Sequence, residues 1–574
     1  MAVVKIVGKS FVVVSFATTA LLASGAHATS VALKAVDGPI GVVANPPGDV
    51  SSSSSEREAP GEIDEPGYEE RYWQVDPRQE VTLTLDESIA LHLSGQYRID
   101  YSQKSELPLS TYKIATYRPS LGQSYLLEHR LRVTPRVSVR RWLTVISQFD
   151  LPHGMVMGRG THDVEQDPEP FDTARPFRFT GRWLYAIVDA GRGRLMIGQL
   201  PVRWGVGLIA GDGDQPQTFG ELRGGTIVDR IGYVGRPLGR KSPFELQLAT
   251  DLVASDRTIR LSKGDLAARG TLAVSYVMDS WRRTGVMIRA EHWQPALPRF
   301  QGSGVTLRER TLTFDWTGRA YLPISGKKTY IFAESEAAAQ VGVTDFNQRV
   351  GADGTALSSR VRRTALVARI GAVQTEGQGQ YRYGRLGADI EWGWASNDAD
   401  PTDDTDSRFV THPSRRVGLI LFDQVLRWKT ARAATALQDP SWARRPSAIG
   451  VGLPTEGGIA GATYVCSTFL VRPHQDLDLR AGFLVADAVG DWVDPAGVTL
   501  LGRYGNFDGG NPTWRDLGVE FDGSVEYRHL WGETIATSVG IEAGVALPGR
   551  AFADQSGTKL PTQALARGRF GIYF

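Results

Sequence analysis

Polar and apolar residues alternate along the chain from about residue 91 to its end. In 128–139, Glu128, Arg130 and Arg132 occupy one set of alternate positions, and mainly leucine and valine occupy the other. The same alternation occurs in three later segments, 311–322, 517–528 and 535–547. Because successive side chains of a strand point to opposite faces, each segment predicts a β-strand with one charged face and one apolar face.

The strands of a soluble antiparallel sandwich also alternate in this way, so the lengths of the segments are needed to distinguish a sandwich from a membrane barrel. These segments are longer than the ~5–6 residues of an ordinary soluble strand. They suit the ~9–11 tilted residues with which a strand crosses a membrane. Tight turns such as 190–194 also alternate with long loops such as 397–458, which is the rule of periplasmic turns and extracellular loops in outer-membrane barrels.

Counting by that rule predicts the number of strands. Short turns are expected near residues 140, 192, 238, 281, 325, 378, 474 and 531. Long loops are expected to start near residues 105, 153, 205, 255, 295, 344, 397, 489 and 548. These connections join about 18 strands, an even number that leaves both termini of the chain on the periplasmic side. A further hairpin within 408–458 would change the count by two.

The chain before the strands divides into two expected parts. Residues 1–28 have Lys5 and Lys9 before an apolar run and small residues before Ala28, which predicts a signal peptide cleaved near Ala28. The apolar run is shorter than the ~20 residues of a membrane-spanning helix. Residues 29–80 are rich in serine, proline and acidic residues and predict a disordered periplasmic tether, with a partner-binding segment as the alternative. Residues 81–574 are left for an all-β, transmembrane, antiparallel up-and-down barrel.

Composition removes several classes of function. The 64 basic and 63 acidic residues give a formal net charge of +1, which provides no basic face for nucleic acid. Cys466 is the only cysteine, so neither an intramolecular disulfide nor a cysteine-rich metal site is possible. Local motifs of serine hydrolases and zinc proteases are absent from the sequence, and we expect no cofactor and no enzyme activity. A hydrolase site assembled across several strands remains an alternative.

The last residues predict both location and assembly. Phe570, Ile572 and Phe574 share one face of the final strand, and this resembles the C-terminal signal of bacterial outer-membrane barrels. The resemblance implies insertion through the barrel assembly machinery by way of Phe574. With the signal peptide, it places the chain in the outer membrane of a Gram-negative bacterium, with outer-membrane lipid around it.

Short motifs resemble a narrower group, the alginate-export-like porins and related uncharacterised myxobacterial outer-membrane barrels. The motifs are spread over most of the barrel, in 128–132, 197–205, 417–422, 517–522 and 547–552. The resemblance implies an 18-stranded monomeric pore that secretes a polysaccharide. A polysaccharide and periplasmic export partners are therefore candidate partners.

The charged faces of the strands are expected to line the lumen, because Arg or Lys facing lipid at mid-depth costs about 2–4 kcal/mol. The candidate conduit residues are Glu128, Arg130, Arg132, Arg136, Arg289, Glu291, Asp315, Arg319, Arg385, Asp389, Glu391, Arg480, Glu520, Asp522, Arg567 and Arg569. They either form ion-pair ladders that stiffen the wall or attract a charged polymer. The three arginines of 130–136 exceed their one acidic neighbour, Glu128, and arginine binds carboxylates bidentately.

The leading hypothesis is therefore a passive outer-membrane conduit for secretion of a polar or acidic polysaccharide. The alternative is a general or substrate-selective porin for small solutes, and a plugged structural or partner-binding barrel is a third possibility. In the longest loop, Val417–Phe422 is too apolar to lie freely in water, so we expect it to pack against the barrel interior or rim.

The same loop carries a cluster of aspartates, Asp398, Asp400, Asp403, Asp404 and Asp406. Carboxylates at this density are candidate Ca²⁺ ligands, since calcium prefers oxygen. The spacing lacks the glycine and distal glutamate of an EF-hand. Solvated surface charge is the simpler interpretation.

Overall fold

The computed structural model describes residues 2–6, 9–13, 42–44 and 81–574, except 87, 108, 110–119, 121, 159–176, 215–216, 221–223, 280, 297–306, 325–327, 347–356, 378–382, 439–447 and 533. The chain forms two compact units, Met1–Ile40 and Gly41–Phe574. In the first, β1 (Ala2–Ile6) pairs antiparallel with β2 (Lys9–Val13). Most of the expected signal peptide and tether lies outside the described residues, so both stay predictions.

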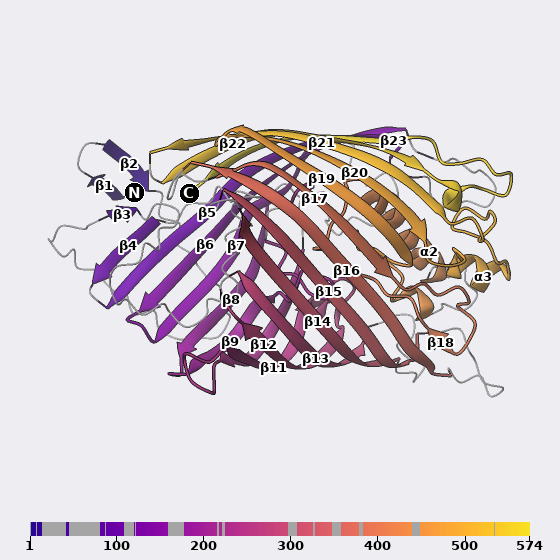
Figure 1. Ribbon diagram of the computed structural model, residues 1–574, viewed down its shortest axis with the longest axis horizontal. Coiled ribbons are helices and arrows are strands. Elements are labelled where there is room, and N and C mark those ends of the chain that lie inside the picture. Colours follow the sequence, from indigo (N-terminus) through magenta and orange to yellow (C-terminus); the bar gives the residue numbers. More distant parts are fainter. Residues whose placement is uncertain are drawn as a thin grey trace, which may run out of the picture. The chain divides into compact units, whose positions relative to one another are not determined.

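The second unit is a closed barrel whose described wall has 18 strands (Figure 1). Thirteen of them follow one another as β5 (Ile89–Ser105), β6 (Gln123–Val139), β7 (Leu143–Gly158), β8 (Arg178–Asp189), β9 (Gly193–Val202), β10 (Thr226–Gly235), β11 (Phe244–Ser255), β12 (Leu266–Val277), β13 (Arg282–Gln294), β14 (Glu309–Ile324), β15 (Thr329–Thr344), β16 (Ser359–Glu376) and β17 (Tyr383–Ala395). The other five are β19 (Ala462–His474), β20 (Leu477–Ala488), β21 (Asp516–Trp531), β22 (Ile535–Pro548) and β23 (Gln563–Tyr573). The predicted fold class and strand number are confirmed.

Each strand pairs antiparallel with the next, and β17 pairs directly with β19. The ring closes where β23 pairs with β5, for example Arg569 opposite Asp100. Next to this seam the backbone N–H of Phe574 donates to the carbonyl of Gly95 at 2.9 Å. On the same edge of β5, before the residues that pair with β23, β4 (Val81–Asp86) pairs with residues 89–93, and β3 (Val42–Ala44) pairs with β4. Two residues, β18 (Thr405–Asp406), add a short parallel pairing to β16.

The connections alternate as the sequence predicts. All eight short turns and all nine long loops join the strands that the pattern assigned to them. The short turns lie at the end of the barrel that holds the C-terminus, and the long loops lie at the other end, which we call the turn end and the loop end (Figure 1). We number the long loops in chain order; two of them, the third loop (203–225) and the seventh loop (396–461), form the functional site below.

The two faces of the wall differ as alternation requires. Ile541 and Phe521 face outward and are 65% and 52% exposed, whereas Glu520 faces inward and is fully buried. An outward apolar face and an inward charged face are what a membrane-spanning barrel needs. Leu517 begins the alternating segment 517–528, whose apolar positions the pattern places on the outer face, but it is buried inside the barrel. An irregularity in the pairing of β20 with β21 there shifts the register, and a one-residue shift moves a side chain to the other face.

The largest apolar core lies inside the barrel near the loop end. It joins inward side chains of the wall, such as Leu484 and Leu565, to the seventh loop. That loop contains a π-helical turn (Leu421–Leu426) followed by α2 (Arg427–Gln438), and α3 (Pro495–Leu501) of the eighth loop packs beside it. Among the described helices, none is long and apolar enough to cross a membrane.

Candidate functional site: two loops folded into the lumen

The third loop folds into the barrel and is bonded to inward-facing carboxylates. The indole N–H of Trp204 donates to Asp315 of β14 at 2.7 Å. The backbone N–H groups of Val206 and Leu208 donate to one oxygen of Glu336 on β15, at 2.6 and 3.2 Å. Glu336 is fully buried, and these bonds compensate the removal of that one carboxylate oxygen from water.

The remainder of the third loop crosses to the opposite wall. The backbone N–H of Gly220 donates to Glu542 of β22 at 3.0 Å. Arg480 of β20 donates to the carbonyl of Thr218 at 3.3 Å. The loop therefore spans the lumen from β14 and β15 to β20 and β22.

The seventh loop enters the lumen next to it. The backbone N–H groups of Leu419, Ile420 and Leu421 all donate to Glu520 of β21, the last two at 2.7 and 2.6 Å. Gly418 has a φ of +73°, which turns these three N–H groups toward one anion. The apolar segment Val417–Phe422 packs in the core inside the barrel, so its predicted burial is confirmed.

The two loops also bond to each other. The backbone N–H of His412 donates to the carbonyl of Leu208 at 2.8 Å, and Arg415 donates to the carbonyl of Val206 at 2.9 Å. The His412 ring lies 3.2 Å from Asp256 of the fourth loop and 3.0 Å from the Thr226 hydroxyl. The loops thus form one connected layer across the lumen.

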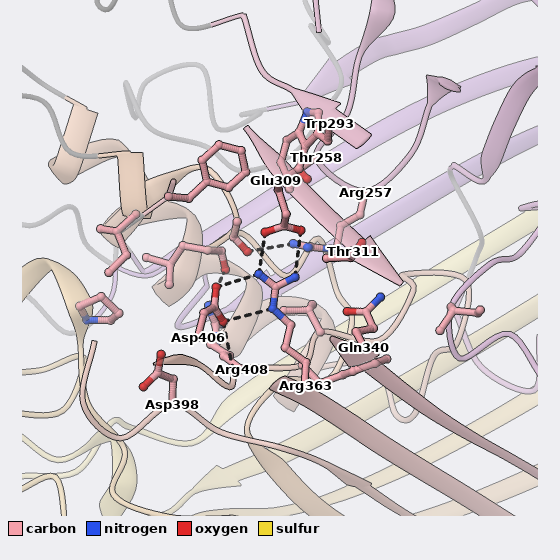
Figure 2. Close-up of a pocket in the computed structure, with 18 of the residues that line it drawn as sticks. Arg257, Thr258, Trp293, Glu309, Thr311, Gln340, Arg363, Asp398, Asp406 and Arg408 are labelled. Atoms are coloured by element: carbon pink, nitrogen blue, oxygen red, sulfur yellow. Dashed lines mark hydrogen bonds and ion pairs between the residues drawn. The ribbon is translucent and has the colours of Figure 1, made fainter. Parts of the chain in front are cut away.

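Two cavities that share no lining residue adjoin this layer. The loop-end cavity has about 140 Å³ (Figure 2). In it, Arg363 is bonded to Glu309 on one side, at 2.8 and 3.0 Å, and to Asp406 on the other, at 2.7 and 3.1 Å. Four buried N–H donors of residues that line this cavity have no acceptor among the described residues, and they belong to Arg289, Trp293, Arg408 and Trp492. They are free for water or a polar solute.

The turn-end cavity has about 220 Å³. Its lining combines both loops, through Trp204 and Arg416, with inward residues of the wall such as Arg319, Glu334 and Asp389. Arg369 reaches Asp389 at 2.9 Å and Glu334 at 3.5 Å, so the charges are arranged in pairs. A solute passing from one cavity to the other would have to pass the two loops.

The arginines of β6 have more acidic partners than the sequence indicated. Arg132, only 3% exposed, donates two bonds to Asp150 of β7 at 2.7 and 2.9 Å and a third to Asp214 of the third loop. The argument that Glu128 is their single acidic neighbour is therefore wrong for Arg132, because the partners come from the next strand and from a loop. Arg130 and Arg136, partly buried on the same strand, also have interactions. Glu128, also on β6, is partly buried and has an interaction.

The twelve other predicted lumen residues fall into three groups. Those that bond to loops are Asp315, Glu391, Arg480, Glu520 and Arg569. Those that line a cavity or pair within the wall are Arg289, Glu291, Arg319, Asp389 and Arg567, and Asp522 is buried beside the carboxylate of Glu520. Arg385 lines neither cavity: it is about half exposed at the turn end and pairs with Glu376 at 2.9 Å. A bulge between Gln374 and Thr375 interrupts the pairing of its strand end, and its place in the conduit stays a prediction.

The aspartate cluster has no common centre. Asp404 pairs with Arg360 and Asp406 with Arg363, each at 2.7 Å, while Asp400 accepts from Tyr504 at 2.7 Å. Within the described residues, no group of three or more acidic, His or Cys side chains could hold a metal ion. The calcium hypothesis is thus not supported, because each aspartate turns to a different partner.

Asp398 gives the loop-end cavity a pH dependence. Its burial and the neighbouring carboxylate of Asp406 raise the pKa of Asp398 to about 7. The folded protein therefore keeps this proton where the unfolded chain releases it, so Asp398 lowers stability progressively as pH rises from about 4 to 7. Between about pH 6 and pH 8 the cavity gains one negative charge.

We expect the reversal potential of the purified protein, measured across a lipid bilayer in a KCl gradient, to shift toward cation preference over that range. The Asp398→Asn variant should lack the shift. An unchanged shift in that variant would assign it to another group. Asp400→Asn is the matched control, because Asp400 lies in the same loop and hydrogen bonds from Thr402 and Tyr504 lower its pKa.

Sequence reasoning missed the residues on the loop side of these contacts. Gly205, with a φ of +55°, precedes the N–H groups that Glu336 binds, and Gly418 precedes those that Glu520 binds. The available signal was a glycine directly before an apolar run in a long loop. Asp214 and His412 carried no signal, because their partners are remote in sequence.

No protein-family model matches the chain, and no characterised protein sequence matches it. Among solved structures, it is similar to the outer membrane protein OprD from Pseudomonas aeruginosa, with a TM-score of 0.45 and 7% identity over 84% of this chain and 93% of that one. It is also similar to Acinetobacter baumannii OccAB1, with a TM-score of 0.44 and 9% identity over 84% of this chain and 96% of that one. These matches give no support to the resemblance to alginate-export-like or myxobacterial barrels.

Proposed function

We propose that the chain forms a narrow channel in a Gram-negative outer membrane and that it admits small polar solutes. The observation that carries the proposal is the layer formed by the third and seventh loops inside a closed barrel. The outward apolar face suits lipid, and the inward face offers paired charges and free donors to a polar solute.

The sizes of the cavities favour small solutes over a polysaccharide. They measure about 140 and 220 Å³. An engineered protein cavity of about 150 Å³ holds one benzene molecule. A polysaccharide would need a continuous path wide enough for its sugars, and the two loops occupy that path. The small-solute alternative therefore accounts for the structure better than secretion does.

The test is transport by the purified protein in lipid vesicles. We expect vesicles to swell in sugars and amino acids of increasing size up to a sharp limit near the monosaccharides, and planar bilayers to show small conductance steps. Charged polysaccharide should neither cross nor block the channel. Passage of the polymer would contradict the proposal, as would bilayers that stay silent both with this protein and with a variant lacking the seventh loop.

A further inference from the structure

Two fully buried wall glutamates make the same contact with two different loops. Glu336 accepts from Val206 and Leu208, and Glu520 accepts from Leu419, Ile420 and Leu421. In both loops the first of these N–H groups directly follows a glycine of positive φ. Repetition of this arrangement on strands far apart in the barrel indicates a common task.

Neither glycine can be replaced without disturbing its contact. A Cβ on Gly418 would lie 2.8 Å from a Glu520 carboxylate oxygen, and a Cβ on Gly205 would overlap the Glu336 carboxylate. Both φ values also lie in the region that other residues rarely adopt. The fit is therefore specific on the loop side as well as on the wall side.

The third and seventh loops are hydrogen-bonded to each other, so the contacts to Glu336 and Glu520 hold the two loops together as one unit. His412 of the seventh loop and Leu208 of the third are joined by a 2.8 Å backbone hydrogen bond, and Arg415 donates to Val206. Backbone hydrogen bonds to two carboxylates can break and re-form without any change in the wall strands, whose own ladders do not involve them.

We propose that Glu336 and Glu520 are positioning residues that hold the third and seventh loops as a single gate, and that release of both contacts together opens the channel. This rests on the proposed function. A solute then passes only during release, and the strength of these hydrogen bonds sets how long the channel stays closed.

The test is single-channel recording of Glu336→Gln and Glu520→Gln, with Gly418→Ala as a variant that disturbs the same contact from the loop. We expect each to raise the ratio of open to closed dwell time about tenfold, the equivalent of one hydrogen bond to a charged group. All should reach the same open conductance, because one gate moves. The matched control is Glu526→Gln. Glu526 shares the inward face of β21 with Glu520, but its carboxylate pairs with Arg528 of the same strand, 3.4 Å away.

A disulfide provides the second readout. A Cβ on Gly544 of β22 would lie 3.4 Å from that of Leu419, near the ~3.8 Å of a disulfide, and 2.5 Å from an Asp522 carboxylate oxygen, so the Asp522 side chain has to move. In a Cys466→Ser background, Gly544→Cys with Leu419→Cys should abolish the openings of Glu520→Gln when oxidised, and dithiothreitol should restore them. A matched disulfide within the seventh loop, Gly450→Cys with Leu437→Cys, where the Cβ atoms lie 3.3 Å apart, should leave them unchanged.

Two results would overturn the inference. The first is that the glutamate and glycine variants have the same dwell times as the parent protein. The second is a different open conductance for each glutamate variant, which would show that the two loops move independently. If instead the parent and a variant without the seventh loop both fail to conduct, the proposed function fails rather than the gate.

Discussion

Removal of residues 411–438, with a short glycine–serine linker in their place, is expected to raise the single-channel conductance several-fold. These residues supply the three N–H groups bound by Glu520 and part of the apolar core inside the barrel. Without them the two cavities would merge, because the third loop loses its bonds to the seventh. The measurement is conductance in planar bilayers, together with the size limit in vesicle swelling.

The wall itself should remain intact in that variant, since the 18 strands bond to one another and not through the loop. Retention of the compact, heat-sensitive migration of a folded barrel on gels is therefore the control. Conductance equal to that of the parent in a folded deletion variant would show that these residues do not narrow the channel.

The largest loss of stability is expected from Asp478→Ala at the turn end. Asp478 accepts from Arg480 and Arg528 at 2.7 Å and from Arg472 at 3.0 Å, and its side chain is 1% exposed. Removing it leaves three arginines, none more than 9% exposed, without their common acceptor. Breaking a buried ion pair by removing one partner costs about 3–5 kcal/mol.

Urea unfolding of the protein folded into lipid vesicles would measure this loss. Asp279→Ala is the matched control, because Asp279 forms an exposed pair with Arg282 on the turn between β12 and β13. Exposed pairs contribute only about 0–1 kcal/mol. Equal midpoints for the two variants would show that the Asp478 cluster does not stabilise the barrel.

Most of the wall could be predicted because its physics is local. A period of two fixes which side chains face lipid, and a short or long connection fixes the hairpin; Phe521 outward and Glu520 inward follow from this alone. The exception, Leu517, lies at a strand end near irregular pairing, which alternation cannot reveal.

The site could be predicted only in part, because its contacts join distant residues. Alternation placed Glu520 in the lumen but could not show that its carboxylate binds Leu419–Leu421, about 100 residues earlier. Likewise Arg132 was correctly placed inside, yet Asp214, 82 residues away, makes it part of a loop contact and not of an open conduit. The charged residues of an inward face thus predict that the lumen is polar. Which of them bind a loop and which line an open path depends on how the loops fold.

The seam between β23 and β5 has a consequence for how the barrel forms. Every other wall pairing joins strands that follow one another along the chain, whereas Arg569 and Asp100 meet across 469 residues. Closing so long a segment costs ~2.5 kcal/mol more entropy than closing a hairpin of about 30 residues. Hairpins should therefore accumulate first and the ring should close last. Until then β5 and β23 are open sheet edges, which invite pairing with other chains. The β4 strand covers residues 89–93 of the β5 edge, leaving residues 96–105 of β5 for β23.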